Sequence, residues 1–182
     1  MHRFAYLLLS LMAVAFAAEP ATSVISKSID NDVKGVEREL VPLVQAMPAD
    51  KFEFAPTHGA FAGVRTFRQQ AMHVGYELYV IGAGLLGEPV PSKSGPDENG
   101  PPEIKTKDEV VKYLQDGFAY AHKAIATITD QNATGLIKSP FGDRQVPRIT
   151  VADIFAWHSF DHYGQMVVYA RMNGIIPPAS RK

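Results

Sequence analysis

Apolar residues recur three and four positions apart over four long stretches of the chain, which is the spacing of an amphipathic helix. The first stretch runs from about Ile25 to Met47, and the others begin at Thr66, Thr106 and Thr150. No run of residues has the alternation of a convincing strand, and no internal repeat is present. Four helices of about 20 residues, each with one apolar stripe, predict an all-α protein built as a four-helix bundle.

Local signals mark where these helices begin and where one of them is disturbed. Thr66 with Gln69, and Thr106 with Glu109, have the spacing of a capping box, which favours a helix start. Pro42 lies inside the first stretch. Because proline lacks a backbone N–H and clashes with the preceding turn, we expect it to kink or split that helix.

The connection between the second and third stretches is long and rich in proline. Residues 87–105 contain five of the thirteen prolines, at positions 89, 91, 96, 101 and 102. Such a segment cannot form a helix or a central strand. A loop of this length is a candidate for a lid or rim over a site, with a plain surface loop as the alternative.

The first 17 residues have the three parts of a secretory signal peptide. A basic start at His2 and Arg3 precedes an apolar run of 13 residues, and positions 15–17 have the A-x-A form of a cleavage site. A run of this length is too short to span a bilayer, which takes about 20 residues. An uncleaved N-terminal anchor is the alternative.

Cleavage near Ala17 leaves one domain over residues 18–182. We therefore expect an exported protein, periplasmic or secreted, with no stable membrane anchor after cleavage.

The amino-acid composition limits the kinds of site that the chain can form. The 182 residues include no cysteine, which excludes a disulfide scaffold, a cysteine-ligated metal centre and a cysteine nucleophile. With 18 basic and 19 acidic side chains the formal charge is -1, so the chain lacks the basic excess of a nucleic-acid-binding protein. We expect a small molecule, and no nucleic acid, as its partner.

Polar side chains interrupt the apolar stripe of the fourth helix. The stripe consists of Val151, Ile154, Phe155, His158, His162, Gln165, Tyr169 and Met172. A buried polar group without a partner costs about 1–3 kcal/mol, so these histidines and Gln165 need partners. Histidines four positions apart lie one turn apart and can bind one metal ion. The alternative is a pair of core histidines hydrogen-bonded to carbonyls or water.

A metal site needs more ligands, and the spacing alone leaves them open. The other histidines are His58 in a loop, His73 in the second helix and His122 at the edge of the third helix's stripe. Glu77 follows His73 by one turn and is a ligand, a partner of a ligand or a surface charge. The pair is not the H-E-x-x-H motif of a metalloprotease, because Ser159 occupies the glutamate position.

Two parts of the chain together resemble the DinB/YfiT-like family. The C-terminal part is His158-Ser-Phe-Asp-His162-Tyr-Gly164-Gln165, followed by Tyr169-Ala-Arg171 and by Gly174-Ile-Ile-Pro177-Pro178. The other part comprises Phe54-Ala-Pro56, Gly59, Val64-Arg65-Thr66-Phe67 and His73, and the loop Pro140-Phe141-Gly142 also fits. The resemblance extends from about the first helix to Pro178.

The resemblance implies a bundle with an up-down-down-up arrangement, and a homodimer. It also implies a divalent metal, zinc or nickel, held by His73, His158 and His162, with Gln165 as a residue that supports a ligand. Three ligands leave coordination positions open, which is typical of a catalytic metal site. The sequence departs from the family at Tyr163, where many members have arginine, and this puts a dimer or substrate contact in doubt.

The function implied is that of a metal-dependent hydrolase or transferase acting on a small molecule. Characterised relatives include S-transferases and an isomerase that use cytoplasmic thiols, so an exported member is a poorer fit to thiol-dependent transfer. The alternative is a non-catalytic exported module that binds a metal or small ligand. This alternative is motivated by the lack of a clear general base in the sequence. Asp161 and Glu77 are the candidates for that role, and we expect Asp161 to be structural.

Overall fold

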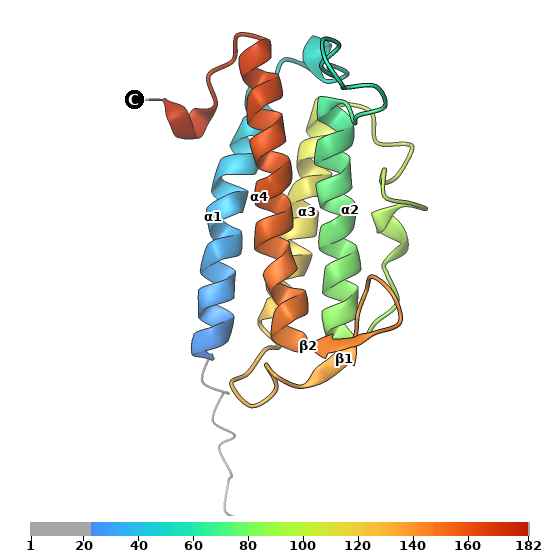
Figure 1. Cartoon of the computed structure of the whole chain (residues 1–182), viewed down its shortest axis with the longest axis vertical. Coiled ribbons are helices and arrows are strands. Elements are labelled where there is room, and N and C mark those ends of the chain that lie inside the picture. The colour runs from blue at the N-terminus through green and yellow to red at the C-terminus, as the bar shows by residue number, and fades with distance from the viewer. Residues whose placement is uncertain (1–22, 182) are drawn as a thin grey trace, which may run out of the picture.

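Four long helices lie side by side in the computed structural model, which describes residues 23–181. They are α1 (Val24–Ala46), α2 (Phe67–Leu86), α3 (Lys107–Ile125) and α4 (Arg148–Met172). In Figure 1, α1 and α4 run upward, whereas α2 and α3 run downward. The predicted all-α bundle is therefore confirmed, with the up-down-down-up order. The predicted signal peptide lies outside the described residues.

Short elements connect the helices. They are the 3-10 turns η1 (Ala49–Lys51), η2 (Ser92–Ser94) and η3 (Pro178–Ser180), and the strands β1 (Leu136–Lys138) and β2 (Gln145–Pro147). The two strands pair antiparallel in a hairpin ahead of α4. The prediction of no strands was wrong here, because three residues are too few to show an alternation. None of the described helices is long and apolar enough to cross a membrane.

Pro42 does not split α1, contrary to expectation. The helix continues through Pro42 to Ala46. Leu43 and Val44, which follow the proline, are fully buried in the core. Their packing holds the last turn in place although Pro42 contributes no backbone hydrogen bond.

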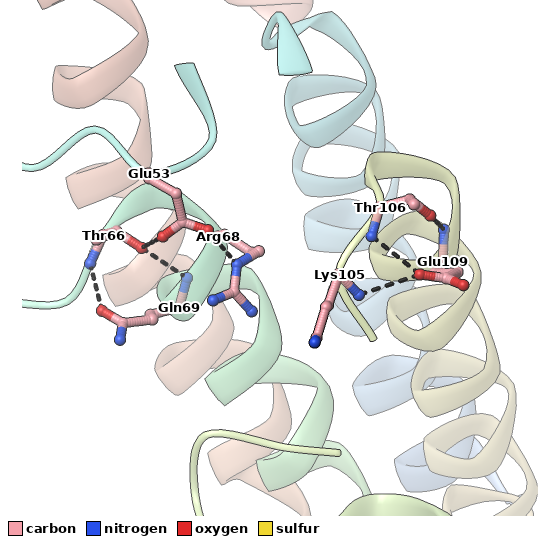
Figure 2. Close-up of polar contacts among 7 residues, drawn as sticks. All are labelled: Glu53, Thr66, Arg68, Gln69, Lys105, Thr106 and Glu109. Atoms are coloured by element: carbon pink, nitrogen blue, oxygen red, sulfur yellow. Dashed lines mark hydrogen bonds and ion pairs between the residues drawn. The ribbon is translucent and has the colours of Figure 1, made fainter. Parts of the chain in front are cut away.

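Both predicted capping boxes are formed (Figure 2). In α2, the Thr66 backbone N–H donates to Gln69 Oε1 at 2.8 Å, and the Gln69 backbone N–H donates to Thr66 Oγ1 at 3.3 Å. Thr106 and Glu109 exchange the same two bonds at the start of α3. The Glu53 carboxylate also accepts from the Thr66 hydroxyl, at 3.2 Å. These bonds fix where α2 begins and hence the direction in which each of its side chains points.

The core fills the space between the four helices and includes two histidines. Its largest fully buried side chains include Tyr79, Phe67, Phe118 and Phe155. His73 and His162 lie within this apolar interior, with only 5% and 6% of their surface exposed.

Glycines allow α2 and α3 to approach closely. An added Cβ on Gly75 would lie 2.4 Å from the Tyr113 ring, far inside van der Waals contact. On α3, a Cβ at Gly117 would lie 3.2 Å from the Gly75 carbonyl oxygen. Tyr113 cannot easily move away, because its hydroxyl donates to the Ser94 carbonyl at 2.7 Å.

We expect Gly75→Ala to lower the free energy of unfolding by about 1–3 kcal/mol, because overpacking outweighs the better helix propensity of alanine. The matched control is Gly164→Ala on the exposed face of α4, where nothing lies within 4 Å of an added Cβ. This control should stabilise the protein by up to about 1 kcal/mol. Urea unfolding measures the change in unfolding free energy for both variants. Equal changes for the two substitutions would contradict the close approach of α2 and α3 at Gly75.

Candidate metal centre

Helices α2 and α4 bring three histidines together. His73 comes from α2, and His158 and His162 come from consecutive turns of α4. One ring nitrogen from each lies within 4.8 Å of the other two. The ring centroids are 4.6–5.2 Å apart.

The other two candidate histidines lie elsewhere. His58 is exposed in the loop before α2. His122 lies between α3 and α1, where its Nδ1 is 2.6 Å from Asp30 Oδ1 and its Nε2 is 3.1 Å from Glu37 Oε2. The antiparallel packing of α2 against α4 thus brings His73, and neither His58 nor His122, to the histidine pair on α4.

The loop between α2 and α3 supplies a partner for His73. His73 Nδ1 lies 3.1 Å from the Glu98 carbonyl oxygen. Since a carbonyl only accepts, Nδ1 must carry the proton and donate, which leaves Nε2 with a free lone pair. This loop, rich in proline, therefore borders the histidine cluster, as expected of a rim.

A chain of three hydrogen bonds fixes the tautomer of His162. Gln165 Nε2 donates to Asp161 Oδ2 at 3.1 Å, and Gln70 Nε2 donates to Gln165 Oε1 at 3.0 Å. Gln70 therefore turns its Oε1 toward His162 Nδ1, with which it is in contact. Because an ionised Asp161 can only accept, the direction of every bond follows: Nδ1 of His162 donates and its Nε2 is left free.

Gln165 thus holds Gln70, the partner of His162, although it is exposed rather than buried. Met172, also placed in the buried stripe, is 51% exposed. The buried face instead passes through Ser159 and Met166, because a straight helix has about 3.6 residues per turn, whereas the predicted stripe repeats every 3.5 residues on average. Asp161 is structural in the sense expected, since it anchors Gln165.

Sequence reasoning missed Gln70, which joins α2 to this chain of bonds. It is 3% exposed and lies three residues before His73. A buried amide one turn from a histidine on an apolar helix is the signal that marks it, because such an amide must bond to something.

His158 completes the cluster, and the surroundings of its ring indicate whether a metal fits there. Its Nε2 is buried and has no hydrogen-bond partner among the described residues. His73 and His162 each keep one nitrogen free, and one ring nitrogen of each of the three histidines lies within 4.8 Å of the other two. An imidazole-only donor set suits zinc or nickel, and a metal would give the orphaned nitrogen its partner. The residues present therefore fit a divalent metal.

Burial keeps all three imidazoles neutral at neutral pH. It lowers the pKa of His158 to about 4 and that of His162 to about 3, with the neighbouring imidazoles adding to the effect. Burial also lowers the pKa of His73, and the positive charge of Arg65 adds to this. Neutral imidazole is the form that binds metal, so no proton has to be displaced at pH 7.

Glu77 is buried beside the cluster but is not part of it. Its side chain is 8% exposed, and its Oε2 has no hydrogen-bond partner among residues 23–181. Burial raises the pKa of Glu77 to about 7, and the Glu98 charge contributes. Glu77 does not share the mutual spacing of the three histidines, so it is not placed as a fourth ligand.

A polar cleft opens onto the cluster at His162. Its volume is about 560 Å³. Four amide side chains line it, from Gln69, Gln70, Asn99 and Gln165. The rest of the lining near His162 consists of the cation Arg65 and of Gly63, Val64 and Glu98. A cleft of this size admits a small molecule.

The depressed histidine pKa values predict acid sensitivity of the metal-free protein. The folded-state pKa of His158 is about 4 against 6.5 for an ordinary histidine, so the unfolded state binds more protons as pH falls below about 6.5. Stability should therefore fall between about pH 6.5 and 4, on the order of 1 kcal/mol for each histidine. His158→Asn should flatten this dependence in urea unfolding, whereas His58→Asn should not. If the unfolding free energy of the two variants depended on pH in the same way, the assignment of this pH dependence to His158 would be contradicted.

Comparison with known proteins agrees with this architecture. The sequence model of the DinB superfamily matches residues 33–166, which is more than half of the chain and includes all three histidines. Among curated proteins, none matches significantly.

A crystal structure of a DinB-like protein from Bacillus cereus is similar in fold. The TM-score is 0.57 at 18% sequence identity, with 86% of this chain and 97% of that chain covered. The chain belongs to the DinB superfamily.

Proposed function

We propose that this protein binds one divalent metal, zinc or nickel, through His73, His158 and His162 and acts on a small molecule as a metal-dependent hydrolase or transferase. The observation that carries the proposal is the buried, unpartnered Nε2 of His158, which belongs to a cluster with two histidines whose Nδ1 atoms are already engaged. A structural core histidine would instead have a hydrogen-bond partner.

The residues around such a site have different roles. Gln70 and the Glu98 carbonyl orient His162 and His73, so the free nitrogens face inward. A divalent metal held there supplies Lewis acidity toward a water or substrate oxygen. The cleft at His162 gives a small substrate access from one side.

The proposal includes export, and export bears on the reaction. The signal-peptide pattern at residues 1–17 would place the mature protein outside the cytoplasmic pool of small thiols. Thiol-dependent S-transfer is then disfavoured relative to hydrolysis, in which water is the co-substrate.

Metal content tests the proposal directly. Protein purified without a polyhistidine tag should contain about one divalent metal per chain by elemental mass spectrometry. His158→Ala should lose most of this metal, because two ligands bind far more weakly than three. His58→Ala, which changes an exposed histidine in a loop, is the matched control and should keep it.

Circular dichroism of each variant separates loss of the metal from loss of the fold. A wild-type protein that remains metal-free after incubation with zinc and with nickel would reject the proposal. Metal retained by a folded His158→Ala variant would reject the ligand set.

Removing the acceptor of His162 should weaken the metal site without touching a ligand. We expect Gln70→Leu to reduce metal affinity about 10- to 100-fold, because His162 then loses the partner that fixes its tautomer and orientation. Gln45→Leu on the exposed face of α1 is the matched control. Competition with a chromogenic chelator measures both affinities; equal values would show that the hydrogen-bond chain does not act on the metal.

A further inference from the structure

We infer that the cleft beside the three histidines binds a small carboxylate anion and that Arg65 is the residue that recognises its charge. This inference rests on the proposed metal site and names the class of ligand that the site takes.

Arg65 lies close to the histidine cluster. It lines the same cleft as His162, and its Nη2 is 3.0 Å from Glu98 Oε2. The same carboxylate oxygen is 3.9 Å from His73 Nδ1.

The backbone at Arg65 is held in place. Its carbonyl oxygen accepts from the Tyr169 hydroxyl at 3.2 Å, which ties the segment before α2 to α4. The next residue, Thr66, is the N-cap of α2. Arg65 therefore starts from a fixed point beside the cluster, and little ordering of the backbone is needed for it to bind a ligand.

The guanidinium has donor capacity that the protein does not use. Its Nε is buried and has no hydrogen-bond partner among the described residues. The ion-pair partner, Glu98, belongs to a loop and has a side chain that is 58% exposed. A guanidinium offers five N–H donors in a planar fork, and an unpaired buried donor is costly. The guanidinium therefore keeps N–H donors beyond the one that pairs with Glu98, and these can bind an acceptor oxygen.

Charge indicates that this ligand is an anion. Imidazole binds a metal in its neutral form, so three histidine ligands would leave both positive charges of a divalent metal uncompensated. Arg65 adds a third positive charge, which its ion pair with Glu98 offsets, so the cleft would keep a positive excess. An oxyanion placed between the metal and the guanidinium reduces this repulsion and fills open coordination positions. The four amides around the cleft then offer further polar contacts rather than an apolar surface.

The number of donors favours carboxylate over phosphate. A carboxylate has two oxygens, which match one guanidinium edge or bridge one guanidinium and one metal. A phosphate is typically held by several backbone N–H groups at a helix start. Here the capping box already engages the backbone N–H groups of Thr66 and Gln69 at the start of α2.

Cobalt-loaded protein provides a spectroscopic test that does not depend on activity. Co²⁺ is bound to the untagged protein and its stoichiometry is measured; acetate, acetamide and inorganic phosphate are then titrated while the visible absorption of the metal is recorded. We expect a saturable change with acetate, none with acetamide and a weaker response to phosphate. Arg65→Gln should weaken acetate binding about tenfold or more while keeping the cobalt content.

Two further variants sharpen the result. Arg68→Gln, which removes an arginine that pairs with Glu53 outside this cleft, should bind acetate like the wild type. Arg65→Lys keeps the charge without the planar fork and should fall between the wild type and Arg65→Gln.

The outcomes separate the two proposals. Unchanged acetate affinity in a cobalt-loaded Arg65→Gln variant would overturn the role of Arg65 and leave the metal site standing. Acetamide that binds as well as acetate, or phosphate that binds more tightly than acetate, would overturn the carboxylate assignment. A wild-type protein that binds no cobalt would reject the metal site and this inference with it.

Discussion

The site depends on one constraint: His73 and His162 are buried and His158 is partly buried between α2 and α4, and each ring must be neutral with its polar atoms satisfied. Charging them there would require removing ions from water, which is why burial depresses their pKa values. Two rings meet the constraint with acceptors, the Glu98 carbonyl and the Gln70 amide. The third has no hydrogen-bond partner at Nε2 within residues 23–181, and this is the atom that the proposed metal would satisfy.

The topology explains why these acceptors are available. Because α2 and α3 run in the same direction, the chain must return along the full length of α2 before α3 can begin (Figure 1). The connection is therefore long, and it passes over the end of α2 that carries His73, where it contributes the Glu98 carbonyl. An antiparallel α2–α3 pair would need only a short turn and would leave His73 Nδ1 without that partner.

Several features of the fold and the site could be predicted from the sequence, for identifiable reasons. The helices followed from apolar spacing, and the starts of α2 and α3 from capping boxes that depend only on local bonds. His158 and His162 stood out because they interrupt an apolar stripe on one helix. His73 required the family resemblance, since its place opposite them depends on the packing of two helices far apart in the sequence. A main-chain carbonyl such as that of Glu98 leaves no sequence signal, and the three-residue strands of the hairpin were too short to leave one.

The parts of the site also differ in how firmly the fold holds them. The histidine nitrogens that we propose as metal ligands project from two packed helices, and Gln70 and Gln165 fix the orientation of His162, so their geometry follows from the core. The groups that would meet a substrate, Arg65 and Asn99, come from the segments on either side of α2. Changes in those loops alter charge and shape in the cleft without disturbing the α2–α4 seam. On the two proposals made above, the bundle would keep one metal centre while its loops determine which small anion binds, and Arg65 is the residue at which these two roles meet.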